Sequence, residues 1–423
     1  MSAAPVTSRV EPVWSLPGCI GFFLAARLCI TFLFFQTEPQ NGAIVAFALN
    51  FALLAAVMFY SFGAGWGALR AARGAAPFLW VLGFLTLAVC SLSWSATVLP
   101  AVALGYWSEL ASEVAMMVLL LRSGPAEMVA RSVMRGYVTG ACAIAAIAWL
   151  SPTMQDLRPG NDDFFSPNAI GFTCAFAIYQ LQYLARREGE WKAGARTVGL
   201  FLAVSLLRTL SKTTIAAFVI AQVFLLFRDN AMSLRSKIIV SAVSLGVIGA
   251  FWGLIASYYA VYSNAGNQAE TLTGRLGIWA FVLERALEQP WIGHGFHSFR
   301  NVIPPFGDFE AWHAHNELLQ QFYTYGLLGI VLLIGIYASL YFYVRRAAPA
   351  GCKKILTSLL LFVVIRGLAD TENFDLSLPL WFITLLSLSL AEAALRSEAG
   401  TTDGARREPA GLHVGDAMRG YVS

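Results

Sequence analysis

The sequence predicts an all-α, polytopic membrane protein of about twelve transmembrane helices. Of its 423 residues, 57% are hydrophobic and 13% are charged, whereas a soluble domain has about 25% charged residues. Its apolar runs are long and unbroken, unlike the short alternating strands of an outer-membrane barrel. Lys and Arg gather in alternate polar connections, which is typical of a chain that crosses the membrane repeatedly.

The transmembrane region is predicted over residues 16–395, between a polar leader at 1–15 and a tail at 396–423. The leader lacks a signal-peptide cleavage pattern, so the first apolar run is expected to be retained as a helix. The composition of the tail indicates disorder. The predicted spans lie near residues 16–36, 43–62, 76–93, 100–121, 136–151, 168–185, 197–209, 212–227, 238–257, 316–343, 354–369 and 376–395. Several are shorter than the roughly 20 residues that a crossing needs, and the shortest pair, 197–209 and 212–227, is a candidate hairpin that does not fully cross.

The distribution of basic residues sets the predicted orientation. With the N-terminus inside, the inside connections hold roughly three times as many Lys and Arg residues as the outside ones. Both termini are therefore expected in the cytoplasm, and residues 258–315 form one large outside loop. Within it, Thr273 is expected to cap an amphipathic helix from Gly274 to Glu288 that lies on the membrane surface or on the other helices. The apolar stripe of this helix comprises Leu276, Trp279, Val282, Leu283, Ala286 and Leu287.

The few outside cations lie at helix ends. Arg208 and Lys212 are four residues apart, a spacing that places both side chains on one face of a helix, and Arg275 opens the loop helix. Cations gathered on one side, with few carboxylates among them, suit an anionic ligand such as a phosphate. Two other interpretations stay open: cations that extend to the membrane surface from a helix end, and a cation–π pair between Arg275 and Trp279.

Four of the five histidines, His294, His297, His313 and His315, fall at the end of the outside loop. His315 is either a general base or oriented donor at the membrane boundary, or forms only a helix cap with Asn316. In the second case, the glycines further along the helix serve close packing. No metal site is expected, because the spacings are loose for zinc and no thiolate or clear carboxylate joins the histidines. His294 and His297 are expected to shape a pocket in a glycine-rich turn.

Acidic residues and absent motifs narrow the class further. Glu109 and Glu113, one turn apart, form a buried polar contact or line a groove, and the acidic outside loop with Asp370, Glu372 and Asp375 is a weak candidate for sugar binding. The sequence has no Walker, GxGxxG or GxSxG motif, and its inside loops have no DxD-type nucleotide-sugar site, so nothing supports an ATPase or a cytoplasmic sugar-nucleotide transferase. No Cys pair has CxxC spacing, the net charge is only +4, and nothing indicates a cofactor or a nucleic-acid partner.

Four segments in order resemble the bacterial O-antigen ligase and polysaccharide polymerase superfamily. FSPNAIG at 165–171 is similar to its F-x-x-N-x-x-G outer loop, and TLSKTT at 209–214 is similar to its T-x-S-R element. TGRLGIW, followed by PWIGHGFHSF within 273–299, is similar to its G-R-x-x-x-W and P-x-x-G-x-G segment. The pair His315-Asn316, followed by GLLG at 326–329, completes the signature. The resemblance covers roughly residues 160–345 and the overall plan of spans with one large outer loop.

The resemblance implies an inverting, metal-independent glycosyltransferase without a cofactor, in the bacterial inner membrane with its active face in the periplasm. Its donor is a glycan on undecaprenyl pyrophosphate. His315 assists the acceptor hydroxyl, either as a base or by positioning it. The cations that hold the pyrophosphate are Arg208, Lys212 and Arg275. Candidate glycan contacts are Asn168, His294 and Asn316. Lys212 departs from the family pattern, because Arg is usual there and Lys lacks its bidentate fork.

Two acceptors are compatible with this resemblance. A polymerase passes the growing glycan to a lipid-linked repeat, and a ligase passes it to the lipid A core. Ser211 to Thr213 looks more like the exopolysaccharide polymerases, which favours polymerisation in exopolysaccharide or O-antigen biosynthesis. Membrane lipid and a chain-length regulator are further candidate partners. A lipid-linked sugar transporter or flippase is the alternative from another class, but the internal repeats that it predicts are not seen in the sequence.

Overall fold

The computed structural model describes residues 14–406, with gaps. Residues 66–73, 152–157, 161–164, 189–192, 301, 306–310 and most of 229–271 lie outside the described part. The described residues form helices and connecting turns, which confirms the all-α class. Four helices are long and apolar enough to cross a membrane, or five if one bent pair counts as a single span. The larger number of about twelve spans stays a prediction.

Most helices of the first half begin within a few residues of the predicted positions, and α7 (Ala126–Leu150) is the exception. The helices of this half are α1 (Leu16–Ala26), α2 (Leu28–Phe34), α3 (Pro39–Tyr60), α5 (Ala76–Ser91), α6 (Pro100–Arg122), α7 and α8 (Pro167–Glu188). The predicted span at 16–36 is bent by 62° between α1 and α2. Helix α7 begins well before residue 136, and within this added stretch Arg135 forms an ion pair with Glu188.

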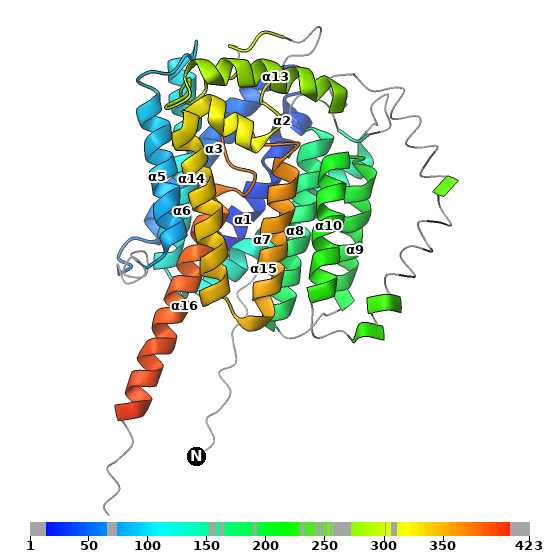
Figure 1. The fold of residues 1–423 in the computed structure, drawn as a ribbon. Helices are drawn as coiled ribbons and strands as arrows, with labels where there is room; N and C mark the ends of the chain where they lie inside the picture. The colour runs from blue at the N-terminus through cyan, green and yellow to red at the C-terminus, as the bar shows by residue number, and fades with distance from the viewer. Residues whose placement is uncertain are drawn as a thin grey trace, which may run out of the picture.

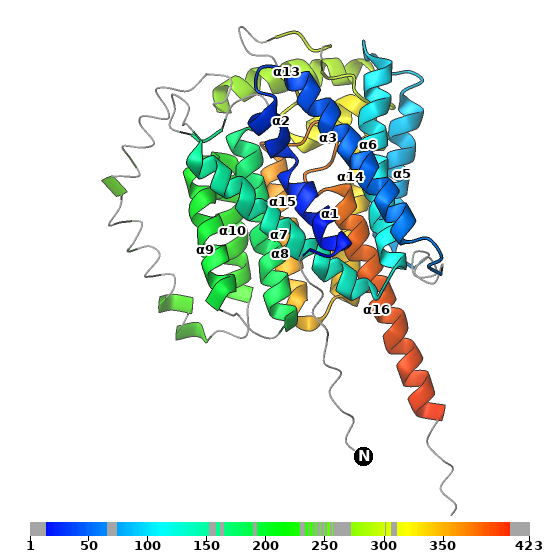
Figure 2. The same cartoon turned by 180° about the vertical axis from the view of Figure 1, so that it is seen from behind.

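The second half supplies the remaining bundle helices and one helix that lies across them. They are α9 (Ala193–Arg208), α10 (Lys212–Arg228), α13 (Leu272–Glu288), α14 (Glu317–Ala347), α15 (Ala350–Gly367) and α16 (Leu380–Arg406). Helix α16 continues past the predicted end of the transmembrane region at 395. The predicted span at 238–257 lies largely outside the described residues. Figures 1 and 2 show the bundle from two sides, with α13 across the end opposite the N-terminus.

Helix α13 lies on the other helices of the bundle, which is one of the two positions predicted for it. It begins at Leu272, so Thr273 lies inside its first turn and not at its cap. Its buried hydrophobic residues are Ile278, Val282 and Ala286, which pack in one cluster with Phe299 and Tyr323. Three residues of the predicted apolar stripe, Leu276, Leu283 and Leu287, are instead exposed. The buried stripe is therefore narrower than the sequence indicated, and the exposed leucines form a separate apolar face.

Helix α14 is broken at Gly326, where the backbone has φ 62° and ψ −151°. The segment around Pro290 contacts this break, and the Leu327 amide donates to the Pro290 carbonyl at 2.8 Å. A Cβ at Gly326 would lie 2.4 Å from the carbonyl carbon of Trp291. Glycine is therefore required both for the positive φ and for the close backbone approach. The expectation that Gly326 only allows helix packing is wrong, because this glycine lets the loop dock into α14.

Candidate functional site

His315 lies in the last turn before α14, with φ 50°. The next residue, Asn316, caps the helix, since its Oδ1 accepts from the Leu319 amide at 3.0 Å. The Asn316 amide group donates to the Leu368 carbonyl at 2.9 Å. Asn316 thus joins the start of α14 to the connection between α15 and α16. The cap interpretation therefore holds for Asn316, and the position of His315 depends on this joint.

Asp370 places a carboxylate beside His315. Its Oδ1 lies 3.5 Å from His315 Nδ1, and its Oδ2 accepts from Arg366 Nη2 at 3.0 Å. Burial alone raises the pKa of Asp370, but the Arg366 guanidinium and the two neighbouring histidines outweigh it and hold the pKa well below its usual range. Asp370 is therefore ionised, and its charge favours one orientation of the His315 ring. The sequence assigned Asp370 only to an acidic, sugar-binding loop.

His313 stands beside His315, with ring centroids 4.1 Å apart. Burial, and then the charge of His315, lowers the pKa of His313 well below its usual value, so His313 is neutral. Its Nδ1 accepts from the His315 amide at 3.2 Å. Ligand atoms of His313, His315 and Asp370 lie within 4.8 Å of one another, a spacing that a metal ion could bridge. The expectation that no carboxylate joins the histidines is therefore wrong. Arg366 on the same carboxylate nevertheless opposes a second cation there.

Arg275 projects from α13 toward the same place. Its Nη1 donates to the Ala369 carbonyl and lies 3.4 Å from Thr213 Oγ1. The residue is 8% exposed, and its described partners are neutral oxygen atoms. Its positive charge is therefore not cancelled by a described carboxylate, in contrast to that of Arg366. A buried guanidinium with an uncompensated charge is suited to bind an anion.

The FSPNAIG and TLSKTT segments also meet. Ser211 Oγ donates to Asn168 Oδ1 at 2.7 Å, and a Cβ at Gly171 would lie 2.9 Å from Thr209 Oγ1. Asn168 thus supports the turn before α10, and the glycine allows the two segments to touch. Since Thr213 follows in the same turn, the contacts continue to Arg275.

The structure separates the two predicted cations of this region. Helix α9 ends at Arg208, the chain turns at Leu210 with φ 52°, and α10 begins at Lys212. The two side chains therefore do not share one helical face, as their spacing suggested. Arg208 Nη1 donates to the Ala148 carbonyl at 2.6 Å, and its guanidinium lies 4.3 Å from the Trp149 ring. Lys212 is exposed at the first turn of α10, next to Thr213. Arg208 is thus engaged with the end of α7, away from Arg275.

His294 and His297 hold the outer loop on the bundle. His294 Nε2 lies 2.8 Å from the Arg285 carbonyl, and its ring stacks on Tyr323 at 4.6 Å. His297 Nδ1 lies 2.7 Å from Thr97 Oγ1. These contacts give both histidines a structural role in the turn, and the glycan contact predicted for His294 stays a prediction.

A cavity of about 390 Å³ with a mixed lining of carboxyl groups, aromatic rings and aliphatic side chains opens beside this site. Its carboxyl groups are Glu109, Glu113, Glu372 and Asp375, and its rings include Tyr106, Trp312, Phe374 and Trp381. Glu372 accepts from Arg366 Nη1 at 3.2 Å, which connects the cavity to Asp370. Carboxylates accept hydrogen bonds from hydroxyl groups, and rings pack against apolar faces. The lining is therefore suited to a saccharide.

Arg27 is a cavity residue that sequence reasoning missed. It stands at the bend between α1 and α2, and its Nη1 donates to Glu109 at 2.9 Å and also to Glu113. Arg27 lies in the middle of the span predicted at 16–36, away from the polar connections. A single cation inside an apolar span was itself a signal, because such residues are rare and mark functional positions.

The fold and this site define a multi-pass helical membrane protein with a histidine–carboxylate pair and a buried cation at one end of its bundle. Residues 197–334 match the model of the O-antigen ligase family, which confirms the resemblance. The chain is 24% identical over 291 residues to the exopolysaccharide production protein ExoQ of Rhizobium meliloti, covering 63% of this chain and 65% of ExoQ. It is 26% identical over 190 residues to an O-antigen ligase of Pseudomonas aeruginosa, covering 44% of each. The chain thus spans less than two thirds of the length of either relative.

Proposed function

We propose that this protein is a membrane glycosyltransferase that transfers a glycan from undecaprenyl pyrophosphate to an acceptor hydroxyl at the periplasmic face. One observation carries the proposal: a continuous series of contacts joins segments of all four motifs. It runs from Asn168 to Ser211 in the TLSKTT turn, from Thr213 of that turn to Arg275, and through the connection at Ala369 and Asp370 to His315. Residues far apart in the sequence thus meet around one buried cation and one histidine.

The reaction follows from these positions. The acceptor oxygen attacks the anomeric carbon of the donor glycan while the bond from that carbon to the pyrophosphate oxygen breaks, with inversion of configuration. The acceptor proton passes to Nε2 of His315, whose Nδ1 faces Asp370. The bonding electrons leave with the pyrophosphate, and Arg275, together with Lys212, stabilises its charge. The products are the extended glycan and undecaprenyl pyrophosphate, and His315 then returns its proton to solvent.

The cavity and the side of the site that holds Arg275 differ in charge, which separates the glycan from the pyrophosphate. In the cavity, Arg27 is compensated by Glu109 and Glu113, so the cavity offers hydrogen bonds without an excess of positive charge. Arg275, on the other side, has only neutral described partners. We therefore assign the glycan to the cavity and the pyrophosphate to the Arg275 side. Of the three predicted cations, Arg208 has the weakest support, because it is bound to the end of α7.

No metal is needed for this reaction. A divalent cation would stabilise the leaving pyrophosphate as a Lewis acid, but a guanidinium can stabilise the same charge. The ligand atoms of His313, His315 and Asp370 are close enough together to hold a metal ion. Their charge does not favour one, because Asp370, the one carboxylate among the three, is already paired with Arg366. The proposal is therefore a metal-independent transferase.

Polymerisation of repeat units is the favoured outcome, because the ExoQ relative covers more of the chain than the O-antigen ligase relative does. Transfer to the lipid A core remains the second candidate, supported by the O-antigen ligase relative. A transporter has less support, because the described site residues gather at one end of the bundle and do not form a central two-sided path.

The test uses a deletion strain that carries wild type, His315→Ala or Lys212→Ala at matched protein levels. Glycan is sized on gels, and lipid-linked repeats are measured by mass spectrometry. Accumulation of single lipid-linked repeats with loss of long glycan supports the polymerase. Long lipid-linked glycan that never reaches the lipid A core indicates the ligase. If neither pool changes in the His315→Ala strain, the catalytic assignment is wrong and the transporter gains support.

A further inference from the structure

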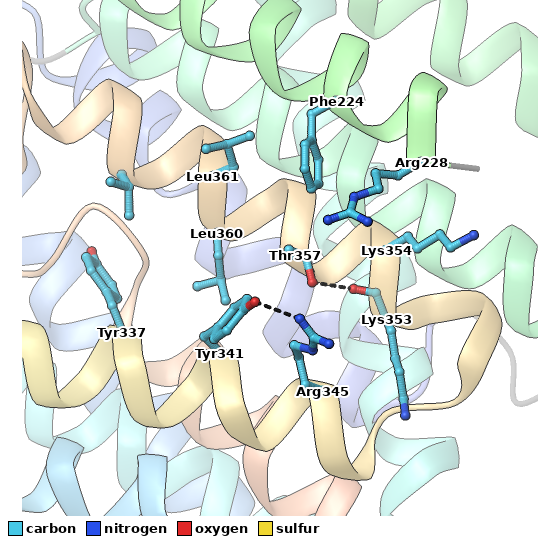
Figure 3. A pocket seen from close by; sticks show the side chains of 11 residues that line it. Phe224, Arg228, Tyr337, Tyr341, Arg345, Lys353, Lys354, Thr357, Leu360 and Leu361 are labelled. Carbon is cyan, nitrogen blue, oxygen red and sulfur yellow. Dashed lines mark hydrogen bonds between the residues drawn. The ribbon is translucent and has the colours of Figure 1, made fainter. Parts of the chain in front are cut away.

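A second cavity lies at the other end of the bundle, between α10, α14 and α15 (Figure 3). It has a volume of about 590 Å³ and is lined by the C-terminal parts of α10 and α14 and by α15 from Lys353 to Val364. Its walls are apolar and aromatic, with contributions from Phe224, Tyr337, Tyr341, Leu360, Leu361 and Val364. The site around His315 uses the opposite ends of the same helices, so this cavity is separate from it.

Four cations from three helices line the mouth of this cavity: Arg228, Arg345, Lys353 and Lys354. No carboxylate is among its lining residues, and none of the four cations forms an ion pair with a described carboxylate. Arg345 Nη1 donates to the Tyr341 hydroxyl at 2.9 Å, so the guanidinium lies over the aromatic wall (Figure 3). The mouth therefore has a strong, uncompensated positive charge.

This charge is more than the usual excess of basic residues on the inner side of a membrane protein. Two arginines at the same end of the bundle are, by contrast, paired: Arg135 with Glu188 and Arg187 with Glu127. Uncompensated cations from separate helices thus converge on one apolar cavity. Such a combination suits a ligand with an anionic group attached to an apolar chain.

The length of the cavity matches one leaflet. Lys353 and Val364 stand about 16 Å apart along α15, given a rise of about 1.5 Å per residue. The hydrocarbon core of a bilayer is about 30 Å thick, so this length corresponds to about half of it. An acyl chain of a phospholipid in the adjacent leaflet fills that length, whereas a long isoprenoid chain exceeds it.

We propose that this cavity binds an anionic phospholipid of the leaflet that, by the predicted orientation, faces the cytoplasm. Its phosphate lies among Arg228, Arg345 and the two lysines, and one acyl chain lies along Leu361 and Val364. The proposal does not depend on the glycosyltransferase activity. At the inner end of the cavity, the Tyr337 hydroxyl donates to Glu317 Oε1 at 2.8 Å, so the bound chain packs against a residue that supports the start of α14.

The test measures lipid binding to the full-length, delipidated protein by native mass spectrometry. Phosphatidylglycerol is expected to bind at least fivefold more tightly than phosphatidylcholine. Arg345→Gln and Lys353→Gln are each expected to weaken phosphatidylglycerol binding by about fivefold, in line with the attraction of one basic side chain to an anionic lipid surface. Leu361→Trp fills the cavity without changing charge and is expected to abolish binding. The matched control is Arg346→Gln, which changes the next, equally exposed cation outside the cavity.

Several results would overturn the proposal. Equal binding of the two phospholipids, or equal effects of Arg345→Gln and Arg346→Gln, would mean that only surface charge attracts lipid. Stabilisation by inorganic phosphate as great as that by phosphatidylglycerol would mean that the acyl chain contributes nothing. Preferential binding of undecaprenyl phosphate that Leu361→Trp removes would make the occupant an isoprenoid lipid. Melting temperatures without lipid identify unfolded variants, and Arg345→Lys, which keeps the charge, is expected to retain binding.

Discussion

Replacing Asp370 by Asn removes the charge that faces His315 and keeps the shape of the side chain. At 3.5 Å, a full imidazolium–carboxylate attraction is about 5 kcal/mol at an effective dielectric constant of about 20. The proton is only partly transferred in the transition state, so we expect about half of this energy to be lost. That loss corresponds to a fall in kcat of about 30- to 150-fold. As a positioning residue, Asp370 should affect kcat far more than the KM for the donor.

The assay is transfer of glycan from a purified lipid-linked donor by the full-length protein in detergent. Glu372→Gln is the matched control, since Glu372 is the other carboxylate paired with Arg366 and has no described contact with His315. This variant is expected to keep kcat within about threefold of wild type. A loss of binding that is equal in the ground state and the transition state raises KM and leaves kcat unchanged. If Asp370→Asn has wild-type kcat, or if both variants lose kcat equally, Asp370 does not act through His315.

Four other predictions follow from the site and the fold. Arg275→Ala should lower kcat by about 10²- to 10³-fold, as expected for loss of a group that stabilises developing charge, while Arg208→Ala has a smaller effect in the same assay. EDTA should leave the transfer rate within about twofold of the untreated rate, and a larger loss that added Zn²⁺ restores would contradict the metal-independent reaction. Gly326→Ala should destabilise the protein by at least about 2 kcal/mol, which would appear as a lower melting temperature. Gly65→Ala, whose added Cβ meets no neighbour, should leave the melting temperature unchanged. Equal melting temperatures of the two variants would show that glycine is not required at position 326. Trp312→Ala should raise the donor KM by about threefold to tenfold, and an unchanged KM would place the donor glycan outside the cavity.

The helices were predictable because apolar runs of sufficient length have few alternatives in a membrane. The contact between His315 and Asp370 was not predictable from their local sequences, since it depends on how α14 packs beside the end of α15. The same applies to the buried face of α13, where Ile278 is covered and Leu276 is not, because the loop beneath the helix decides which residues meet it. Arg27 could have been found from the sequence, because it is a lone cation inside an apolar span and not part of a polar loop.

The break of α14 at Gly326 has a consequence for how force passes through the molecule. The part of α14 between His315 and Gly326 is held by hydrogen bonds from the segment that follows Pro290. It is separated by the break from the continuous helix that follows Gly326. A pull on the outer loop would therefore reach the backbone next to His315 before it reached the rest of α14. The break divides α14 into a segment coupled to the outer loop and a segment coupled to the bundle.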